Sequence, residues 1–193
     1  MLDVVETELS GVLVIEPKVH RDSRGYFLET WREEVYAAAG LPARFVQDNL
    51  SYSIKGVLRG LHYQHPSGQG KLIAVLQGSA FDVAVDIRLG SPTFGQWVGV
   101  MLSEENRRQI YIPPGFAHGF VVIGEGALVS YKCTTAYDAA SEGSIHWNDP
   151  DLGIAWPLDA PILSPKDQAA PRLSAVATHR LPRFEPERDG SEA

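Results

Sequence analysis

Hydrophobic and polar residues alternate most regularly between Lys71 and Arg88, in the stretch "KLIAVLQGSAFDVAVDIR". A β-strand places every second side chain on the same face. One face of the second half therefore carries Phe81, Val83, Val85 and Ile87, and the other carries Asp82, Ala84, Asp86 and Arg88. Two β-rich runs flank "QGS" (77–79), which predicts a hairpin turn at that point.

Similar short patterns recur along the chain and predict many strands separated by glycine- and proline-bearing turns. The further strand candidates are "GVLVIEP", "GYFLETW", "QWVGVML", "QIYIP", "GFVVIG" and "ALVSYKCTT". Helical patterns are confined to "REEVYAAAG", which ends in a C-capping glycine, and to a turn near "SPKDQAA". So many strands with so little helix predict an all-β sandwich or barrel.

The pattern changes near Ala170, where the chain becomes proline-rich and polar. We therefore expect one domain over residues 1–169 and a loosely packed C-terminal extension over residues 170–193. Its end, "FEPERDGSEA", is expected to be a loosely held tail.

The overall composition excludes several classes of protein. The 193 residues carry a net charge of −7, which argues against nucleic acid as a partner. No apolar run approaches the roughly 18 residues that span a bilayer, and "MLDVVETELSGV" lacks the features of a signal peptide, so no membrane partner is expected. Cys133 is the only cysteine, which rules out an internal disulfide and favours a reducing, cytoplasmic location.

The segment "RGLHYQH", residues 59–65, concentrates groups that can carry out chemistry. On a strand, His62 and His65 point to opposite faces, so they cannot bind one metal ion without a bulge. Metal-binding barrels favour His-x-His with a carboxylate soon after, whereas here no Asp or Glu lies between His65 and Asp82. We therefore expect no metal, although a site completed by His118 or by a partner chain stays open. His65, just before Pro66, is expected in a loop.

His62 remains a candidate for proton transfer, against the simpler interpretation of a hydrogen-bonded histidine without a catalytic role. Other cationic groups stand at predicted strand ends: Lys71 in "GKL", His118 in "IPPGFAHGF" and Arg24 in "DSRGYF". Alone, each is typical of a solvated surface. Together they indicate a pocket for phosphate groups.

Long blocks of the chain, in this order, resemble the dTDP-4-dehydrorhamnose 3,5-epimerase family of the cupin superfamily. The blocks cover residues 16–168 and include "DSRGYFLE", "QDNLSYSIKGVLRGLHYQ", "GKLIAVLQGSAFDVAVDIRLGSPTFGQW", "RQIYIPPGFAHGF", "YKCTTAYDAASEGSIHWNDPDLGIAWP" and "LSPKD". The resemblance implies a cupin-type jelly roll that works as a homodimer with exchanged strands and needs no metal or organic cofactor. It also implies the substrate dTDP-4-keto-6-deoxyglucose, whose carbons 3 and 5 are inverted.

The resemblance also implies roles for particular residues. Inversion next to a ketone needs a base, an acid on the opposite face and a group that stabilises the enolate. By resemblance His62 is the base, Asp167 orients it, Lys71 faces the enolate oxygen and Tyr131 returns the proton. From the residues alone, Tyr131 equally fits a core tyrosine. Asp167, at the third helical position after the N-cap Ser164, equally fits a helix N-terminus.

The family's substrate-binding positions also carry over. They are Arg24, Glu29, Gln47, Asp48, Asn49, Arg59, Lys71, His118, Glu142 and Lys166. Arg24 and Glu29 are expected to come from the neighbouring chain of the dimer. Three further residues are supporting candidates: Asp82, expected to steady His62 or Lys71, Tyr137, which fits a sugar or base contact as well as a surface position, and Phe27.

Three other functions remain open at this point. A related cupin could invert only one carbon of another dTDP-4-keto-deoxysugar, using the same residues. A non-catalytic jelly roll could bind a sugar nucleotide without exchanging its protons. A metal-dependent cupin oxygenase or isomerase is the third alternative.

Overall fold

The computed structural model describes residues 2–186. Its strands are β1 (Asp3–Glu6), β2 (Leu13–Glu16), β3 (Val19–Asp22), β4 (Gly25–Leu28), β5 (Gln47–Ile54), β6 (Leu58–Gln64), β7 (Lys71–Asp86), β8 (Trp97–Ser103), β9 (Gln109–Ile112), β10 (Phe116–Cys133) and β11 (Glu142–Ser144). The helices are α1 (Glu33–Ala37) and α2 (Pro165–Gln168), followed by the 3₁₀ turns η1 (Leu173–Ala175) and η2 (Thr178–Arg180).

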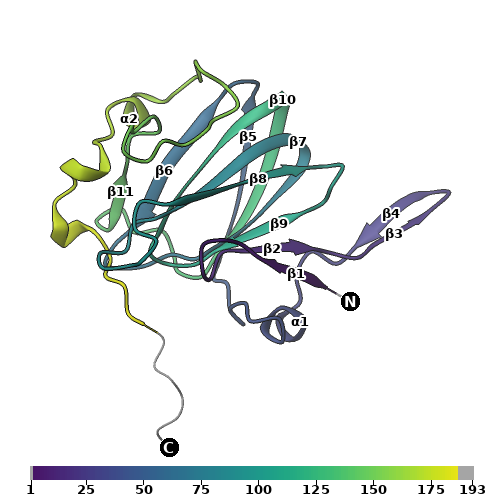
Figure 1. The fold of residues 1–193 in the computed structure, drawn as a ribbon. Helices are drawn as coiled ribbons and strands as arrows, with labels where there is room; N and C mark the ends of the chain where they lie inside the picture. The colour runs from purple at the N-terminus through teal and green to yellow at the C-terminus, as the bar shows by residue number, and fades with distance from the viewer. Residues whose placement is uncertain (1, 187–193) are drawn as a thin grey trace, which may run out of the picture.

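Two packed layers of antiparallel strands form the body of the molecule (Figure 1). β7 and β10 are long enough to belong to both layers, and they pair with each other along most of their length. In one layer, β7 pairs with β9, which is followed in the sheet by β2 and β1, and β10 pairs with β5 on the other side. In the other layer, β7 and β10 lie between β8 and β6, and β6 pairs with β11. The predicted all-β jelly roll is confirmed.

The predicted hairpin at 77–79 is wrong, because β7 runs through these residues without reversing. Gly78 adopts a φ of +77°, and a Cβ there would collide with the backbone carbonyl of Gly126 on β10. The register between β7 and β10 shifts at the same place. A glycine bulge therefore bends the strand from one layer into the other. β10 passes between the layers in the same way, with a register shift between Val122 and Ala127. The two candidates "GFVVIG" and "ALVSYKCTT" are therefore parts of this single strand.

The alternation along β7 sorts its side chains onto two faces as predicted, but the face expected to be polar is buried as well, since Asp82, Ala84 and Asp86 have almost no exposed surface. Ala80 and Ala84 face the core between the layers, together with Ile73, Ile110 and Phe120. The other face packs outside the second layer, in a cluster that contains Phe81, Val83, Val85, Ile87, Leu61, Ile145, Leu173 and Leu181. A third cluster, beneath α1, contains Ile15, Tyr36, Leu41, Leu72 and Tyr111.

The C-terminal segment, residues 170–186, covers the outer face of the second layer. The side chains of Leu173 and Leu181 are buried there, and Leu89 and Arg183 form a parallel β-bridge. The expected loose packing is therefore wrong for this segment: its few apolar side chains are spaced to reach the outer face of β7. The predicted loose tail "FEPERDGSEA" lies outside the described residues from Glu187 onward.

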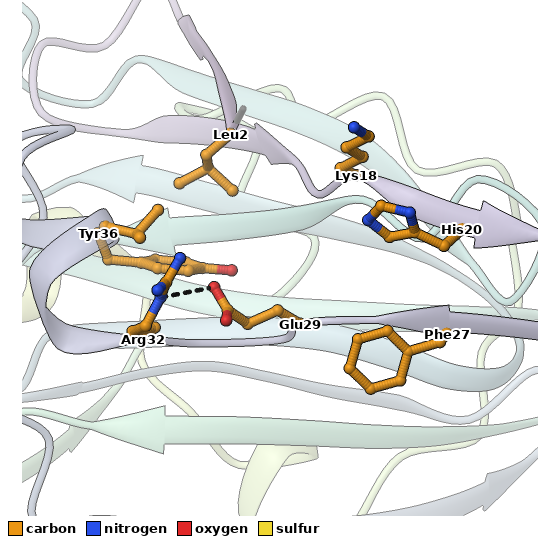
Figure 2. A pocket seen from close by; sticks show the side chains of 8 residues that line it. Leu2, Lys18, His20, Phe27, Glu29, Arg32 and Tyr36 are labelled. Carbon is orange, nitrogen blue, oxygen red and sulfur yellow. Dashed lines mark hydrogen bonds and ion pairs between the residues drawn. The ribbon is translucent and has the colours of Figure 1, made fainter.

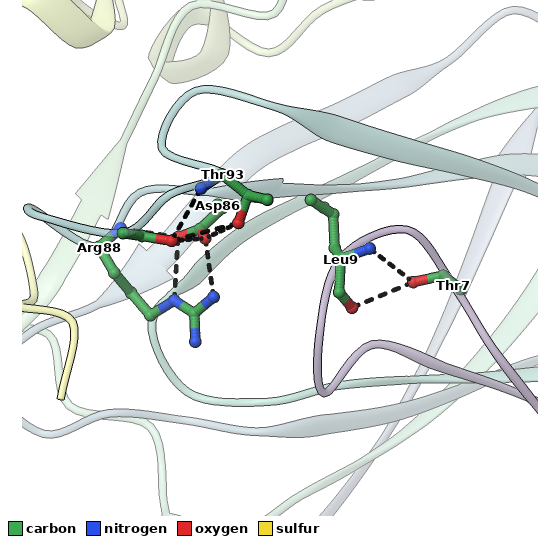
Figure 3. Close-up of polar contacts among 6 residues, drawn as sticks. Thr7, Leu9, Asp86, Arg88 and Thr93 are labelled. Carbon is green, nitrogen blue, oxygen red and sulfur yellow. Dashed lines mark hydrogen bonds and ion pairs between the residues drawn. The ribbon is translucent and has the colours of Figure 1, made fainter. Parts of the chain in front are cut away.

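A buried carboxylate fixes the loop between β7 and β8 (Figure 3). Asp86 accepts hydrogen bonds from the Arg88 backbone and guanidinium group, at 2.9, 2.9 and 2.7 Å, and from the hydroxyls of Ser91 and Thr93. Burial alone would raise the pKa of Asp86, but these donors hold it below its usual value. The Arg88 guanidinium group also lies over the rings of Phe116 and Phe184, which ties the C-terminal segment to the loop. A smaller contact in the same view is Thr7, whose hydroxyl donates to the carbonyl of Leu9.

The capping residues predicted at the end of α1 and at the start of α2 are both present. Gly40, with a φ of +84°, follows α1, and the amide of Leu41 donates to the carbonyl of Tyr36, as in a glycine C-cap. Ser164 caps α2 by accepting from the Asp167 amide at 3.1 Å, and Pro165 is the first helical residue. Within residues 2–186, neither helix is long and apolar enough to cross a membrane.

Candidate active site

A polar cavity of about 340 Å³ opens at one end of the sandwich. Its walls come from β5, β6, β7, β10, β11 and the loops that follow β6 and β10. The lining residues are Gln47, Asn49, His62, Tyr63, Gln64, Gln69, Lys71, Tyr131, Tyr137 and Glu142. Seven of these ten residues were predicted from the sequence: Gln47, Asn49, His62, Lys71, Tyr131, Tyr137 and Glu142.

The strand register brings these side chains to one wall. Tyr131 on β10 lies opposite Asn49 on β5, and Cys133 lies opposite both Gln47 on β5 and Lys71 on β7. Residues directly opposite on antiparallel strands share a face of the sheet. The pairing of β5, β7 and β10 therefore brings side chains that are distant in the sequence to one wall, and the two-residue period keeps them on the same face.

His62 is paired with Asp167 of α2. The Nε2 atom of His62 lies 2.5 Å from Oδ1 of Asp167, and Oδ2 of Asp167 accepts from the Ser164 hydroxyl at 2.9 Å. Burial would raise the pKa of Asp167, but the hydrogen bond and charge of His62 lead a set of interactions that lower it. Because this carboxylate is ionised, Nε2 of His62 must carry the hydrogen. A neutral ring then keeps Nδ1 free to accept a proton.

The two interpretations of Asp167 therefore hold together. Its position at the third residue of α2 is the capped helix start that the sequence predicted, and its carboxylate also reaches His62. The Asp167 side chain is buried, whereas that of His62 is 30% exposed and lines the cavity. The start of α2 thus places one buried carboxylate against the histidine, on the side of the ring away from the cavity.

Asp82 was expected to steady His62 or Lys71, and only the first alternative is wrong. The hydrogen-bond partner of Asp82 is His118, while its charge reaches Lys71 and opposes the lowering of the Lys71 pKa. Oδ2 of Asp82 lies 2.9 Å from Nε2 of His118, and both side chains are buried. On β10, Phe120 stands directly opposite Asp82, and His118 is two residues from Phe120 on the same face. Burial lowers the pKa of His118 even though Asp82 opposes that shift, so the imidazole is held in its neutral form.

Lys71 and Tyr131 both lie in desolvated surroundings. Burial lowers the pKa of Lys71, and the charges of Cys133, Asp82 and Glu142 oppose this. Burial raises the pKa of Tyr131, partly against the positive charge of Arg59. Tyr131 packs against the core between the layers, as a core tyrosine would, and it also lines the cavity. Its role as proton donor stays a prediction.

Glu142 joins three parts of the cavity mouth. Its carboxylate forms an ion pair of 2.5 Å with Lys166 of α2 and accepts from the Tyr137 hydroxyl at 3.1 Å. Burial would raise the pKa of Glu142, but Lys166 and the other polar neighbours hold it below its usual value. Tyr137 therefore lines the cavity mouth while more than half of it stays exposed, so it is also a surface tyrosine.

Six predicted binding residues are not among those that line the cavity in this chain: Arg24, Glu29, Asp48, Arg59, His118 and Lys166. His118 is buried against Asp82, and Lys166 reaches the mouth only through its ion pair with Glu142. Asp48 lies on the outer face of β5 and pairs with Lys132 at 2.9 Å. Arg59 donates from Nε to the Ser53 hydroxyl at 2.9 Å, close enough for its charge to affect Tyr131. Arg24, which pairs with Asp22, and Glu29, which pairs with Arg32, belong to the β3–β4 arm and the chain just after it.

That arm, residues 19–29, stands apart from the main sheet (Figure 1). A second cavity of about 230 Å³ lies at its base, lined by Leu2, Lys18, His20, Phe27, Glu29, Arg32, Val35 and Tyr36 (Figure 2). Phe27, the third supporting candidate, is 71% exposed. Within one chain, neither Phe27 nor Glu29 lines the first cavity.

Sequence reasoning missed Tyr63, Gln64 and Gln69. Gln64 follows His62 by two residues on the same strand, so the strand period could have found it. Its side chain donates to Ser67, and that of Gln69 donates to Thr135. Both amides hold loops at the cavity rim. No three His, Cys, Asp or Glu side chains gather as metal ligands would in residues 2–186.

Known proteins are similar to this chain in both sequence and fold. The family model described as dTDP-4-dehydrorhamnose 3,5-epimerase matches residues 6–175. The enzyme of that name from Salmonella typhimurium is 54% identical over 176 residues, which cover 90% of this chain and 96% of the relative. The dTDP-4-dehydrorhamnose 3-epimerase of Streptomyces niveus is 43% identical over 164 residues, covering 84% of this chain and 79% of the relative.

A solved structure agrees with these sequences. The dTDP-6-deoxy-D-glucose-3,5-epimerase of Legionella pneumophila, in complex with dTDP-4-keto-L-rhamnose, superposes with a TM-score of 0.93 at 54% identity. The match covers 96% of this chain and all of that one.

Proposed function

Because the chain belongs to the dTDP-4-dehydrorhamnose 3,5-epimerase family, we propose that its first cavity inverts carbons 3 and 5 of dTDP-4-dehydro-6-deoxy-D-glucose. The product is dTDP-4-dehydro-L-rhamnose, an intermediate of dTDP-L-rhamnose biosynthesis. The observation that carries the proposal is the His62–Asp167 pair, whose His62 ring lines one cavity with Lys71 and Tyr131.

The chemistry needs these residue types. Carbons 3 and 5 both lie next to the ketone at carbon 4, so removing either proton gives an enolate. His62 takes the proton on Nδ1, and the ionised Asp167 stabilises the imidazolium that forms. Lys71 places its ammonium group near the developing negative charge of the enolate oxygen. Tyr131 returns a proton to the other face, which inverts the carbon.

The anionic nucleotide needs cationic and amide partners, and the chain provides them around the cavity. Gln47 and Asn49 line it with amide groups, and Lys166 stands at its mouth with Glu142. Arg59 and Arg24 suit the pyrophosphate through paired guanidinium hydrogen bonds.

We further propose a homodimer in which the arm of one chain reaches the cavity of the other. Within residues 2–186, β5 pairs only with β10, so its second edge has no partner strand. The outward side chains of Leu50, Tyr52 and Ile54 on β5 are exposed, as is Phe27 on the arm. An unpaired edge with an apolar face is suited to a strand from a second copy. Arg24, Phe27 and Glu29 would then act in the neighbour's site.

Inversion at carbon 3 alone is the second candidate function, favoured by the likeness to the Streptomyces niveus 3-epimerase. The cytoplasm is the proposed location, supported by a single buried cysteine. The composition and charge fit a small anionic substrate as the partner, without nucleic acid.

Proton NMR of dTDP-4-keto-6-deoxyglucose with the enzyme in D₂O tests the function. We expect deuterium to enter positions 3 and 5 and the rhamno-configured product to appear. Exchange at one carbon would replace the proposal with a single inversion. Binding without exchange would leave a sugar-nucleotide-binding protein. Loss of exchange after dialysis against a chelator, restored by metal, would favour the metal-dependent alternative.

A further inference from the structure

The outer edge of β11 is covered by the C-terminal segment. The amide of His65 donates to the carbonyl of Ser141, and Leu61 and Ile145 exchange both backbone hydrogen bonds. In an antiparallel pair the intervening residues point their backbone groups the other way. The carbonyl of Glu142 therefore faces away from β6.

Arg180 binds this outward edge. Its guanidinium group donates from one nitrogen to the carbonyl of Glu142 at 2.7 Å and from another to the carbonyl of Ala140 at 3.3 Å. Next to it, the amide of His146 donates to the carbonyl of Pro171. A three-residue edge strand has few bonds of its own, so these contacts supply much of its restraint.

The strand that Arg180 holds carries part of the cavity wall. Glu142 lies opposite Gln64, and Ser144 lies opposite His62. From β11 the Glu142 carboxylate reaches Tyr137 and Lys166 at the mouth. Arg180 is also close enough to Tyr63 for its charge to counter part of the rise in the pKa of Tyr63 that burial causes.

From these contacts we propose that Arg180 is a positioning residue for the substrate cavity, acting through β11 and Glu142. It lies beyond residues 6–175, the part that the family model matches. In Figure 1 the C-terminal segment runs beside β11 and α2. These two elements carry Glu142, which lines the cavity, and Asp167, which pairs with His62. The inference rests on the proposed function, since it concerns how that cavity holds its nucleotide sugar.

The effect should fall on binding more than on chemistry. Glu142, Tyr137 and Lys166 shape the mouth, whereas His62 is held by its own strand and by Asp167. Removing Arg180 leaves two edge carbonyls to water and lets β11 shift. Small displacements of substrate-contacting groups are costly because binding depends on their geometry.

The test uses the full chain with Arg180→Ala, Arg180→Lys and the control Arg183→Ala. Arg183 belongs to the same segment and is exposed, so its loss matches the change in charge. We expect Arg180→Ala to raise KM about five- to twentyfold, with kcat within about twofold. Arg180→Lys, which keeps one cationic donor, should recover part of the loss. The control should stay within about twofold of the wild type in both constants.

Two further measurements separate positioning from general stability. In a Glu142→Gln background, Arg180→Ala should add little to KM, because coupled residues are not additive. Hydrogen exchange at the amides of Gly143 and Ile145 should quicken in Arg180→Ala but not in the control.

Equal KM values in folded Arg180→Ala and Arg183→Ala would overturn the proposal, even if exchange at β11 quickened. If Arg180→Ala does not fold, the KM and exchange of Arg180→Lys decide in the same way. If the wild-type protein does not turn over dTDP-4-dehydro-6-deoxy-D-glucose, the proposed function is wrong. In that case the affinity for dTDP and the exchange rates would still decide whether Arg180 positions the cavity.

Discussion

Two histidine–aspartate pairs lie side by side in this protein, and only one of them lines the cavity. His62 on β6 and His118 on β10 stand directly opposite each other. His62 is paired with Asp167 from a helix start and keeps 30% of its side chain exposed. His118 is paired with Asp82 from the adjacent strand, and only 10% of its side chain is exposed.

The difference shows that a residue pair takes its role from its surroundings. At His62, a ligand can approach the ring, because it lines the cavity and the buried Asp167 carboxylate contacts it through Nε2 only. At His118, burial favours the neutral ring despite the neighbouring carboxylate. The first pair is therefore suited to moving a proton. The second is suited to a fixed hydrogen bond beside Lys71, whose charge also disfavours the imidazolium.

The largest expected effect is that of His62→Ala. Loss of a general base commonly costs about two to four orders of magnitude, and one base must serve both carbons. Exchange at positions 3 and 5 should fall together, while dTDP binding, measured by calorimetry, should change little. Activity within a few-fold of wild type would show that the exposed pair does not move the proton.

Asp167→Asn should have the next largest effect. The amide can still accept from Ser164 but no longer carries the charge that supports the imidazolium. We expect kcat/KM to fall at least about tenfold. As a helix-start carboxylate alone, Asp167 would contribute only about 0.3–1 kcal/mol.

Melting temperature measured alongside kcat/KM separates these roles. A loss of stability with near-normal turnover would mean that Asp167 is only a helix-capping residue.

The pH dependence of stability gives a second check. The pKa of Asp167 is lowered in the folded state, so its stabilising contribution is present above its unfolded value near 3.9 and disappears as the pH falls through the folded value. Asp167→Asn should lose this acid-dependent component.

The strand pattern predicted the fold well because each β-strand has a local period. It failed at Gly78, since a bulge and a hairpin turn use the same residue type and only the partner strand distinguishes them. It also failed for residues 170–186. Leu173 and Leu181 are too sparse to signal packing until the outer face of β7 is known to need a cover.

The site divides along similar lines. The residue pattern alone identified His62, Lys71 and His118 as chemical candidates, and the resemblance supplied Tyr131 and Asp167. The partner of Asp82 could not be read from the sequence, because it depends on the register between β7 and β10. Arg180 gave no signal either, since its role requires knowing which carbonyls of β11 face outward.

The smallest expected effect concerns the buried pair, and stability is the measurement. The pKa of His118 is lowered in the folded state by burial, with Lys71 and His62 adding to the shift and Asp82 opposing it. An unfolded histidine takes up its proton near pH 6.5. Between that pH and the lower folded value, the unfolded state binds more protons. The stability from a neutral His118 is therefore complete above about pH 6.5 and declines below it.

His118→Gln removes this titration and keeps a side-chain amide that can donate to Asp82. We expect the wild type to lose melting temperature between pH 7 and pH 5, and the variant to lose less, by about 2–4 °C for each kcal/mol involved. His179→Gln, at an exposed histidine of η2 away from the arm, is the matched control and should follow the wild-type profile. Parallel profiles for wild type and His118→Gln would mean that burial does not hold His118 neutral. The two histidine pairs would then differ in exposure alone.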